Sequence, residues 1–218
     1  MQNFASILLT IPGVILAIVI RGFSRAYVSD KLGDPSPRIM GKLNLSPRSH
    51  IDPFGFFLLL LFHFGWSKPV FTDSRYYKNP RKGKILVALS GTIGNLLVAV
   101  ISLALYKLLS TIIIPSSFLY PLVDILSFSV GINISLGLFY LIPLPPLDGF
   151  DILQVFVSYK YYRILEFLRQ YGNIILLLLI LTNLVGFILP YNLVYRLLNL
   201  LTYPLDLILL KLGKNLRI

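Results

Sequence analysis

Three polar side chains interrupt strongly apolar stretches of this sequence, and each is a candidate for chemistry inside a membrane. Asp148 lies in "LIPLPPLDGF", Asn95 in "SGTIGNLL" and Asn133 in "GINISLG". A polar group at membrane depth is costly, so it is a functional candidate whose partner should be identified. Asp148 also fits an ordinary proline-rich turn in which the carboxylate bonds its own backbone. The two amides fit either hydrogen bonds between membrane helices or a cavity that holds a peptide backbone.

The residues that usually bind catalytic metals are scarce in this chain. His50 and His63 are its two histidines, and they lack the i, i+4 spacing that points two imidazoles at one metal from a single helix. We expect His50 to cap a turn and His63 to lie near the membrane interface. There are no cysteines, which excludes disulfides, thiolate metal sites and a cysteine nucleophile.

Two arginines stand near the end of the first apolar segment, in "VIRGFSR". Arg21 and Arg25 are four residues apart and therefore lie on one face of a helix. One interpretation is that both are cationic anchors that snorkel at a helix end. The other is that both reach Asp148, so that two fixed positive charges neutralise a desolvated carboxylate.

The composition indicates a membrane protein. The chain has 218 residues, of which 56% are hydrophobic and 13% charged, whereas about 25% of the residues of an ordinary soluble domain are charged. Several apolar stretches are long enough to cross about 30 Å of hydrocarbon as helices, without the alternation that a barrel strand requires. We therefore predict an all-α polytopic fold.

We expect a single membrane domain over residues 1–218. The segment 51–66 contains Pro53 and Gly55 and is short for a crossing, so we expect it to be re-entrant or a short second segment. Three core helices and two C-terminal helices account for the other apolar stretches. The expected apolar segments are 4–27, 51–66, 85–109, 120–142, 173–189 and 193–210.

The formal net charge is +11, and the distribution of the basic residues follows the positive-inside rule if segment 51–66 does not cross the membrane. The basic loops 28–50, 67–84 and 143–171 then lie together on the cytoplasmic side. The N-terminus is expected outside, the C-terminus in the cytoplasm, and the basic face against a bilayer with an anionic cytoplasmic leaflet. Nucleic acid is not expected as a partner, because membrane topology already explains the charge.

Six short motifs together resemble the site-2 protease family of intramembrane zinc metalloproteases, in its compact bacterial branch without a PDZ domain. The resemblance covers about Pro12 to Leu153 and includes the family's order and spacing of motifs. These motifs are "AYVSDKLGDPSPR", "LNLSPRSHIDPFG", "FGWSKPV", "YYKNPRKG", "LSGTIGNLL" and "FYLIPLPPLDG".

The resemblance implies a zinc site formed by the two histidines of an HExxH motif and the Asp of an LDG motif, with the glutamate activating water. The LDG aspartate falls on Asp148. HExxH falls on "RGFSR", so Arg21 and Arg25 replace the histidines and Gly22 replaces the glutamate. The Asn of the family's GPxxN motif falls on Asn95, with Thr92 in place of the proline. Asn95 and Asn133 are the candidate substrate-binding residues.

The expected function is that of a bacterial multi-pass cell-membrane protein with this protease scaffold but no catalysis. Zinc is the family's cofactor, and we expect none in this chain, because an arginine has no lone pair for a metal and Gly22 is no general base. Such a protein could still bind single-pass transmembrane substrates or partner proteins. The alternatives are an inactivated variant of an active intramembrane zinc endopeptidase that cleaves transmembrane segments, a transporter, or a helix-packing scaffold.

Overall fold

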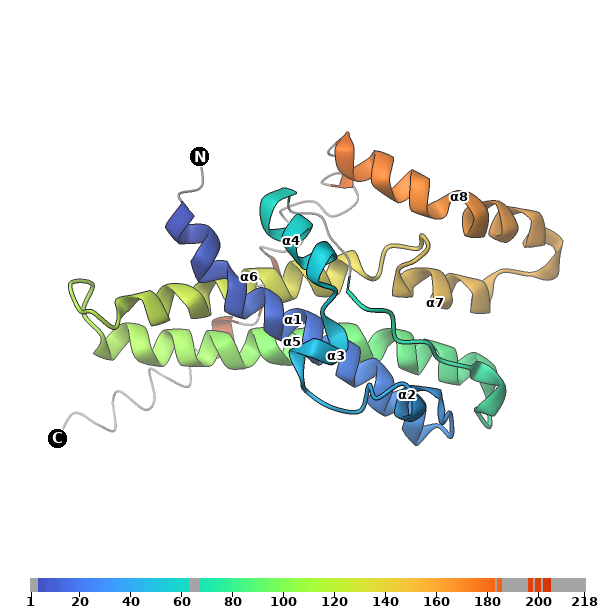
Figure 1. Cartoon of the computed structure of the whole chain (residues 1–218), viewed down its shortest axis with the longest axis horizontal. Helices are drawn as coiled ribbons and strands as arrows, with labels where there is room; N and C mark the ends of the chain where they lie inside the picture. The colour runs from blue at the N-terminus through green and yellow to red at the C-terminus, as the bar shows by residue number, and fades with distance from the viewer. Residues whose placement is uncertain are drawn as a thin grey trace.

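The fold is built on three long helices that pack against one another in every pairwise combination (Figure 1). They are α1 (Phe4–Lys31), α5 (Pro80–Ile112) and α6 (Tyr120–Phe139). The computed structural model describes residues 4–62, 67–182, 184–185, 196–197, 199–200 and 202–204. Within these residues every regular element is helical, which confirms the predicted all-α class.

Four helices are long and apolar enough to cross a membrane, so the chain is a multi-pass membrane protein. They are the three core helices and α8 (Tyr162–Leu181). At 1.5 Å per residue, even the 20-residue helices are about 30 Å long, which matches the hydrocarbon thickness.

The core helices bury many small and polar residues beside apolar ones such as Leu103 and Ile134, and they expose further large apolar residues, as is typical of helices surrounded by lipid. On α5 the buried face includes Ser90, Gly91 and Ala99, whereas Leu97 and Ile101 are exposed. The small residues let backbones approach closely. A polar contact also joins α5 to α6, because the Thr92 hydroxyl donates to the carbonyl of Gly137 at 3.0 Å.

Helix α5 begins at Pro80, five residues before the apolar segment predicted at 85–109. The side chain of Asn79 accepts a hydrogen bond from the backbone N–H of Lys82, and Pro80 occupies the first turn. This cap starts the helix within the basic segment. The first turn of α5 therefore belongs to the region that the sequence predicted as the loop 67–84.

The segment between α1 and α5 contains only short elements. It holds α2 (Ser36–Ile39), α3 (Pro47–His50), α4 (Pro53–Phe62) and the 3₁₀ turn η1 (Ser74–Tyr76). The ten residues of α4 extend about 15 Å, half of the hydrocarbon thickness. The segment 51–66 was expected to be short or re-entrant, but His63 and Trp66 lie outside the described residues. Ser67 pairs with Ile51 in an antiparallel bridge.

After α6 the chain forms two further helices where the sequence predicted the loop 143–171. They are α7 (Asp148–Phe156) and the first half of α8, which begins at Tyr162 rather than 173 (Figure 1). Hydropathy missed this half because Arg163, Glu166 and Arg169 are polar, yet they lie on an exposed face. Helix α8 covers residues 173–181 of the predicted segment 173–189, and residues 183 and 186–189 lie outside the described residues. Most of the predicted segment 193–210 lies outside the described residues.

Candidate functional site

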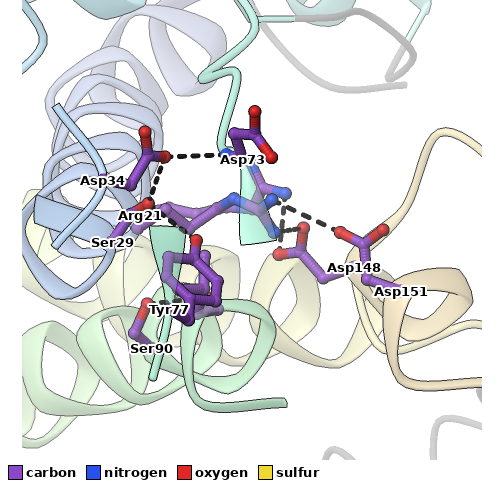
Figure 2. Close-up of polar contacts among 10 residues, drawn as sticks. Arg21, Ser29, Asp34, Asp73, Tyr77, Ser90, Asp148 and Asp151 are labelled. Carbon is purple, nitrogen blue, oxygen red and sulfur yellow. Dashed lines mark hydrogen bonds and ion pairs between the residues drawn. The ribbon is translucent and has the colours of Figure 1, made fainter. Parts of the chain in front are cut away.

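The sequence-predicted residues Arg21, Arg25 and Asp148 lie together in the structure (Figure 2). Nη2 of Arg21 donates to one carboxylate oxygen of Asp148 at 2.8 Å, and Nη1 of Arg25 donates to the other. Asp148 is 2% exposed, and the two arginines are 9% and 7% exposed. The site is therefore a buried carboxylate shared by two guanidinium groups.

Three helices position this cluster. The i, i+4 spacing on α1 puts both arginines on one face, and Asp148 is the first residue of α7, where a carboxylate suits the helix dipole. Helix α5 lies against the cluster at Gly91. A Cβ at Gly91 would be 2.9 Å from Cγ of Arg21 and 3.4 Å from the Asp148 carboxylate. Gly91 is therefore a site residue that was not among the candidates predicted from the sequence.

Two further contacts surround the arginines. The Arg21 guanidinium lies over the Tyr140 ring, with its central carbon 3.3 Å from the ring centroid. Nη2 of Arg25 also reaches the carboxylate of Asp151 at 3.5 Å. Asp151 is the partly exposed neighbour of the cluster, since its side chain is 42% exposed. Neither Tyr140 nor Asp151 has a sequence signal apart from its proximity to Asp148.

The residues around Asp148 do not fit a catalytic zinc ion. Such a site needs three protein ligands with free lone pairs, and the two side chains beside Asp148 are hydrogen-bond donors without any. Among the described residues there is no group of three or more His, Cys, Asp or Glu side chains that could hold a metal. In the geometry observed, the guanidiniums neutralise the carboxylate.

Gly22 lies between the two arginines and contacts His50 from α3. A Cβ added at Gly22 would overlap the His50 imidazole ring at Nδ1. His50 is almost fully buried, and its Nε2 bonds the carbonyl oxygen of Asn44 at 2.8 Å. His50 thus bonds the turn before α3 through the Asn44 carbonyl and also packs against α1 at Gly22. A glutamate at position 22 would require this ring to move.

A cavity of about 370 Å³ opens beside the cluster. It lies between the core and α8, because Asn173, Leu176 and Leu177 of α8 form one wall. The opposite side is formed by Arg21, Arg25, Phe139, Tyr140 and the residues 146–148, and the extended residues Ser67, Pro69 and Val70 complete it. The cavity thus combines an apolar wall with two buried cations.

Asn95 and Asn133 do not line this cavity. Both are fully buried, Asn95 on α5 beside Gly137 and Asn133 on α6. The Asn133 amide donates to the Ser129 carbonyl at 2.8 Å and reaches the Gly13 carbonyl on α1 at 3.5 Å. Neither polar atom of the Asn95 amide has a hydrogen-bond partner among the described residues.

A second buried polar network, which sequence reasoning missed, fastens the basic segments to the end of α1 (Figure 2). The Ser29 hydroxyl donates to Asp34 at 2.8 Å and contacts the Tyr77 hydroxyl at 2.7 Å, and the Asp73 N–H donates to Asp34 at 2.7 Å. Burial opposes ionisation of Asp34, but these bonds and those from Ser36 hold its pKa below the ordinary value. The Tyr77 side chain is buried, and this burial raises the pKa of its hydroxyl group.

Comparison with known proteins identifies one relative. The chain is 34% identical over 178 residues to the protein named "Putative zinc metalloprotease YwhC" of Bacillus subtilis (strain 168). The alignment covers 81% of this chain and 81% of the relative. No protein-family model and no solved structure matches the chain. At this identity and coverage, the chain belongs to the same protein family as the metalloprotease-like YwhC.

Proposed function

We propose that the chain is a non-catalytic member of its metalloprotease family. Its scaffold would be of the intramembrane site-2 type, and it would bind transmembrane segments without cleaving them. The observation that carries the proposal is the pair of guanidinium groups on Asp148. They occupy the positions that the family resemblance assigns to the zinc-binding histidines.

The chemistry of these residues supports the absence of hydrolysis. A guanidinium stays protonated in a protein and has no lone pair, so Arg21 and Arg25 cannot act as metal ligands. Gly22 has no side chain that could take a proton from water. Asp148 alone supplies one ligand where a catalytic zinc requires three from the protein.

Binding without cleavage is supported by the cavity between α8 and the core. Its lining includes the extended residues Ser67, Pro69 and Val70 and the apolar side chains Leu176 and Leu177. An extended segment beside an apolar wall suits a peptide that has left helical structure. Substrate contact by Asn95 and Asn133 would require the core helices to separate, and it stays a prediction.

The proposal is tested by restoring the motif in steps. The unaltered chain is compared with Arg21→His/Arg25→His, which has three potential zinc ligands, and with the triple variant that adds Gly22→Glu. Zinc is measured by plasma mass spectrometry, and cleavage is measured on a single-pass membrane reporter. We expect neither zinc nor cleavage in the unaltered chain, zinc in the double variant, and cleavage in the triple variant once His50 has moved aside.

The matched control is the triple variant with Asp148→Asn, which removes the third ligand and should lose zinc and cleavage together. Co-purification of an uncut single-pass reporter with the unaltered chain tests binding separately. Zinc-dependent cleavage by the unaltered chain would contradict the proposal of inactivity. A failure to retain the reporter would contradict the proposed binding of transmembrane segments.

A further inference from the structure

The buried charges of the arginine cluster do not balance. Arg21, Arg25 and Asp148 are each at least nine-tenths buried, and together they carry two positive charges and one negative charge. Asp151 adds a negative charge, but its side chain is 42% exposed and lies 3.5 Å from Arg25, so water weakens its contribution. An excess positive charge buried in the protein is unfavourable, and an anion in the adjoining cavity would compensate it.

The Arg21 guanidinium also has donors left for such an anion. Its Nη2 bonds Asp148, whereas its buried Nε has no hydrogen-bond partner among the described residues. The Tyr140 ring lies against the group, with its centroid 3.3 Å from the central guanidinium carbon. A guanidinium whose donors are only partly paired is suited to bind an oxygen of a phosphate or carboxylate.

The depth of the cluster indicates which anion is available. Arg21 and Arg25 lie about 25 to 32 Å along the axis of α1 from Phe4, whereas the hydrocarbon layer is about 30 Å thick. The guanidiniums therefore stand near the level of the lipid headgroups, on the side where the basic segments gather. Leu176 and Leu177 of α8 give the cavity an apolar wall beside these charges.

We propose that this cavity binds the phosphate group of an anionic phospholipid. The phosphate lies against the guanidiniums of Arg21 and Arg25, which both line the cavity, and the acyl chains leave the cavity along the leucine wall of α8. A volume of about 370 Å³ is in the range of small-molecule sites. This inference does not depend on the proposed binding of transmembrane segments. It assigns a specific lipid site in the cavity, whereas the basic loops would be attracted to the anionic leaflet only in general.

The test measures lipid bound to the purified full chain by native mass spectrometry, with phosphatidylglycerol and phosphatidylcholine added to the micelles. Arg21→Gln removes one cavity charge and leaves Arg25 paired with Asp148. Its matched control is Arg81→Gln, which removes the same charge from an exposed position outside the cavity. We expect Arg21→Gln to weaken phosphatidylglycerol binding by about tenfold or more, the size of a lost charge-assisted contact, and Arg81→Gln to leave it unchanged.

A second variant, which removes a negative charge instead of a positive one, keeps the test decisive if Arg21→Gln does not fold. Asp148→Asn leaves both guanidiniums without their carboxylate, so added phosphatidylglycerol should raise its melting temperature more than that of the unaltered chain. The proposal would be overturned if Arg21→Gln and Arg81→Gln lost phosphatidylglycerol binding equally. It would also be overturned if the lipid raised the melting temperature of Asp148→Asn less than that of the unaltered chain. Equal binding of phosphatidylcholine, or full competition by millimolar inorganic phosphate, would overturn the assignment to an anionic lipid.

Discussion

Asp148 illustrates how much a single buried residue depends on its neighbours. Its carboxylate bonds one guanidinium with each oxygen, and all three groups are removed from water. Asp148→Asn should lower the free energy of unfolding by roughly 3–5 kcal/mol, because it leaves buried positive charges without a counterion. A thermal melt of the purified protein in detergent measures this loss.

The matched control for this prediction is Asp151→Asn, which removes the same charge from a partly exposed neighbour of the same arginine. Its effect should stay below about 1 kcal/mol, as for other solvated ion pairs. Changing Arg21 and Arg25 to glutamine in the Asp148→Asn background should restore most of the stability. Equal effects of the two aspartate variants would show that the arginines face water.

His50 gives the protein a predicted dependence on pH. Burial lowers the pKa of its imidazole below the ordinary value of 6.5; the bond to the Asn44 carbonyl opposes this shift, and the nearby charge of Lys42 adds to it. Below pH 6.5 the unfolded chain therefore binds a proton more readily than the folded chain, so stability should fall as the pH decreases from 6.5 towards the lowered folded pKa.

Melting temperatures between pH 7.5 and pH 5 measure this effect, with His50→Gln as the variant that lacks the titrating group. The unaltered protein should lose more stability than His50→Gln over this range. Lys42, which bonds the Ser49 carbonyl, is present in both proteins and therefore does not contribute to the difference. Identical slopes for the two proteins would rule out His50 as the cause.

At the scale of helices, the contact between α1 and α5 depends on a small residue under the arginine cluster. Gly91→Ala adds a Cβ 2.9 Å from the stem of Arg21, in a place enclosed by Arg25 and Asp148. Overpacking of this kind should destabilise the protein by about 1–3 kcal/mol, although alanine is the better helix former. The melting temperature of the variant measures the loss.

Gly131 in α6 provides a control with the opposite expected sign. A Cβ at this position would have no atom within 4 Å, so Gly131→Ala should be neutral or stabilise the helix by up to about 1 kcal/mol. If Gly91→Ala behaved in the same way as Gly131→Ala, the close contact between α1 and α5 would not limit packing at the site.

At the scale of the whole molecule, the basic segments predict one orientation in the membrane. Since the chain has no cysteine, single cysteines can report on topology without background. Ser46 lies in the basic region before α3, and Ser116 lies in the short connection between α5 and α6, and both are exposed. The positive-inside rule places Ser46 in the cytoplasm and Ser116 outside.

An impermeant maleimide applied to intact cells should therefore label Ser116→Cys and leave Ser46→Cys unlabelled until the membrane is opened. Labelling after solubilisation controls for the reactivity of each cysteine. The reverse labelling pattern would show that the orientation is opposite to the predicted one. Labelling of both cysteines in intact cells would show that Ser46 and Ser116 lie on the same side, which contradicts the predicted topology.

The sequence by itself determined the fold class and the membrane setting. Apolar segments of spanning length can satisfy their backbone hydrogen bonds only as helices, so the core helices α1, α5 and α6 could be predicted from hydropathy. The first half of α8 and the start of α5 could not, because an exposed polar face and the Asn79 cap lie outside a hydropathy signal. The i, i+4 spacing also determined that Arg21 and Arg25 share a face.

The tertiary structure alone decided what these arginines face. Asp148 is more than 120 residues from either of them, and no local pattern specifies a contact over that separation. Only the packing of α1 against α3, α5 and α7 shows that Gly91 lies against the cluster and that His50 lies against Gly22. The tertiary structure also buries Tyr77 between Ser29 of α1 and Gly83 of α5. Proximity in space, rather than residue type, turns these side chains into a site.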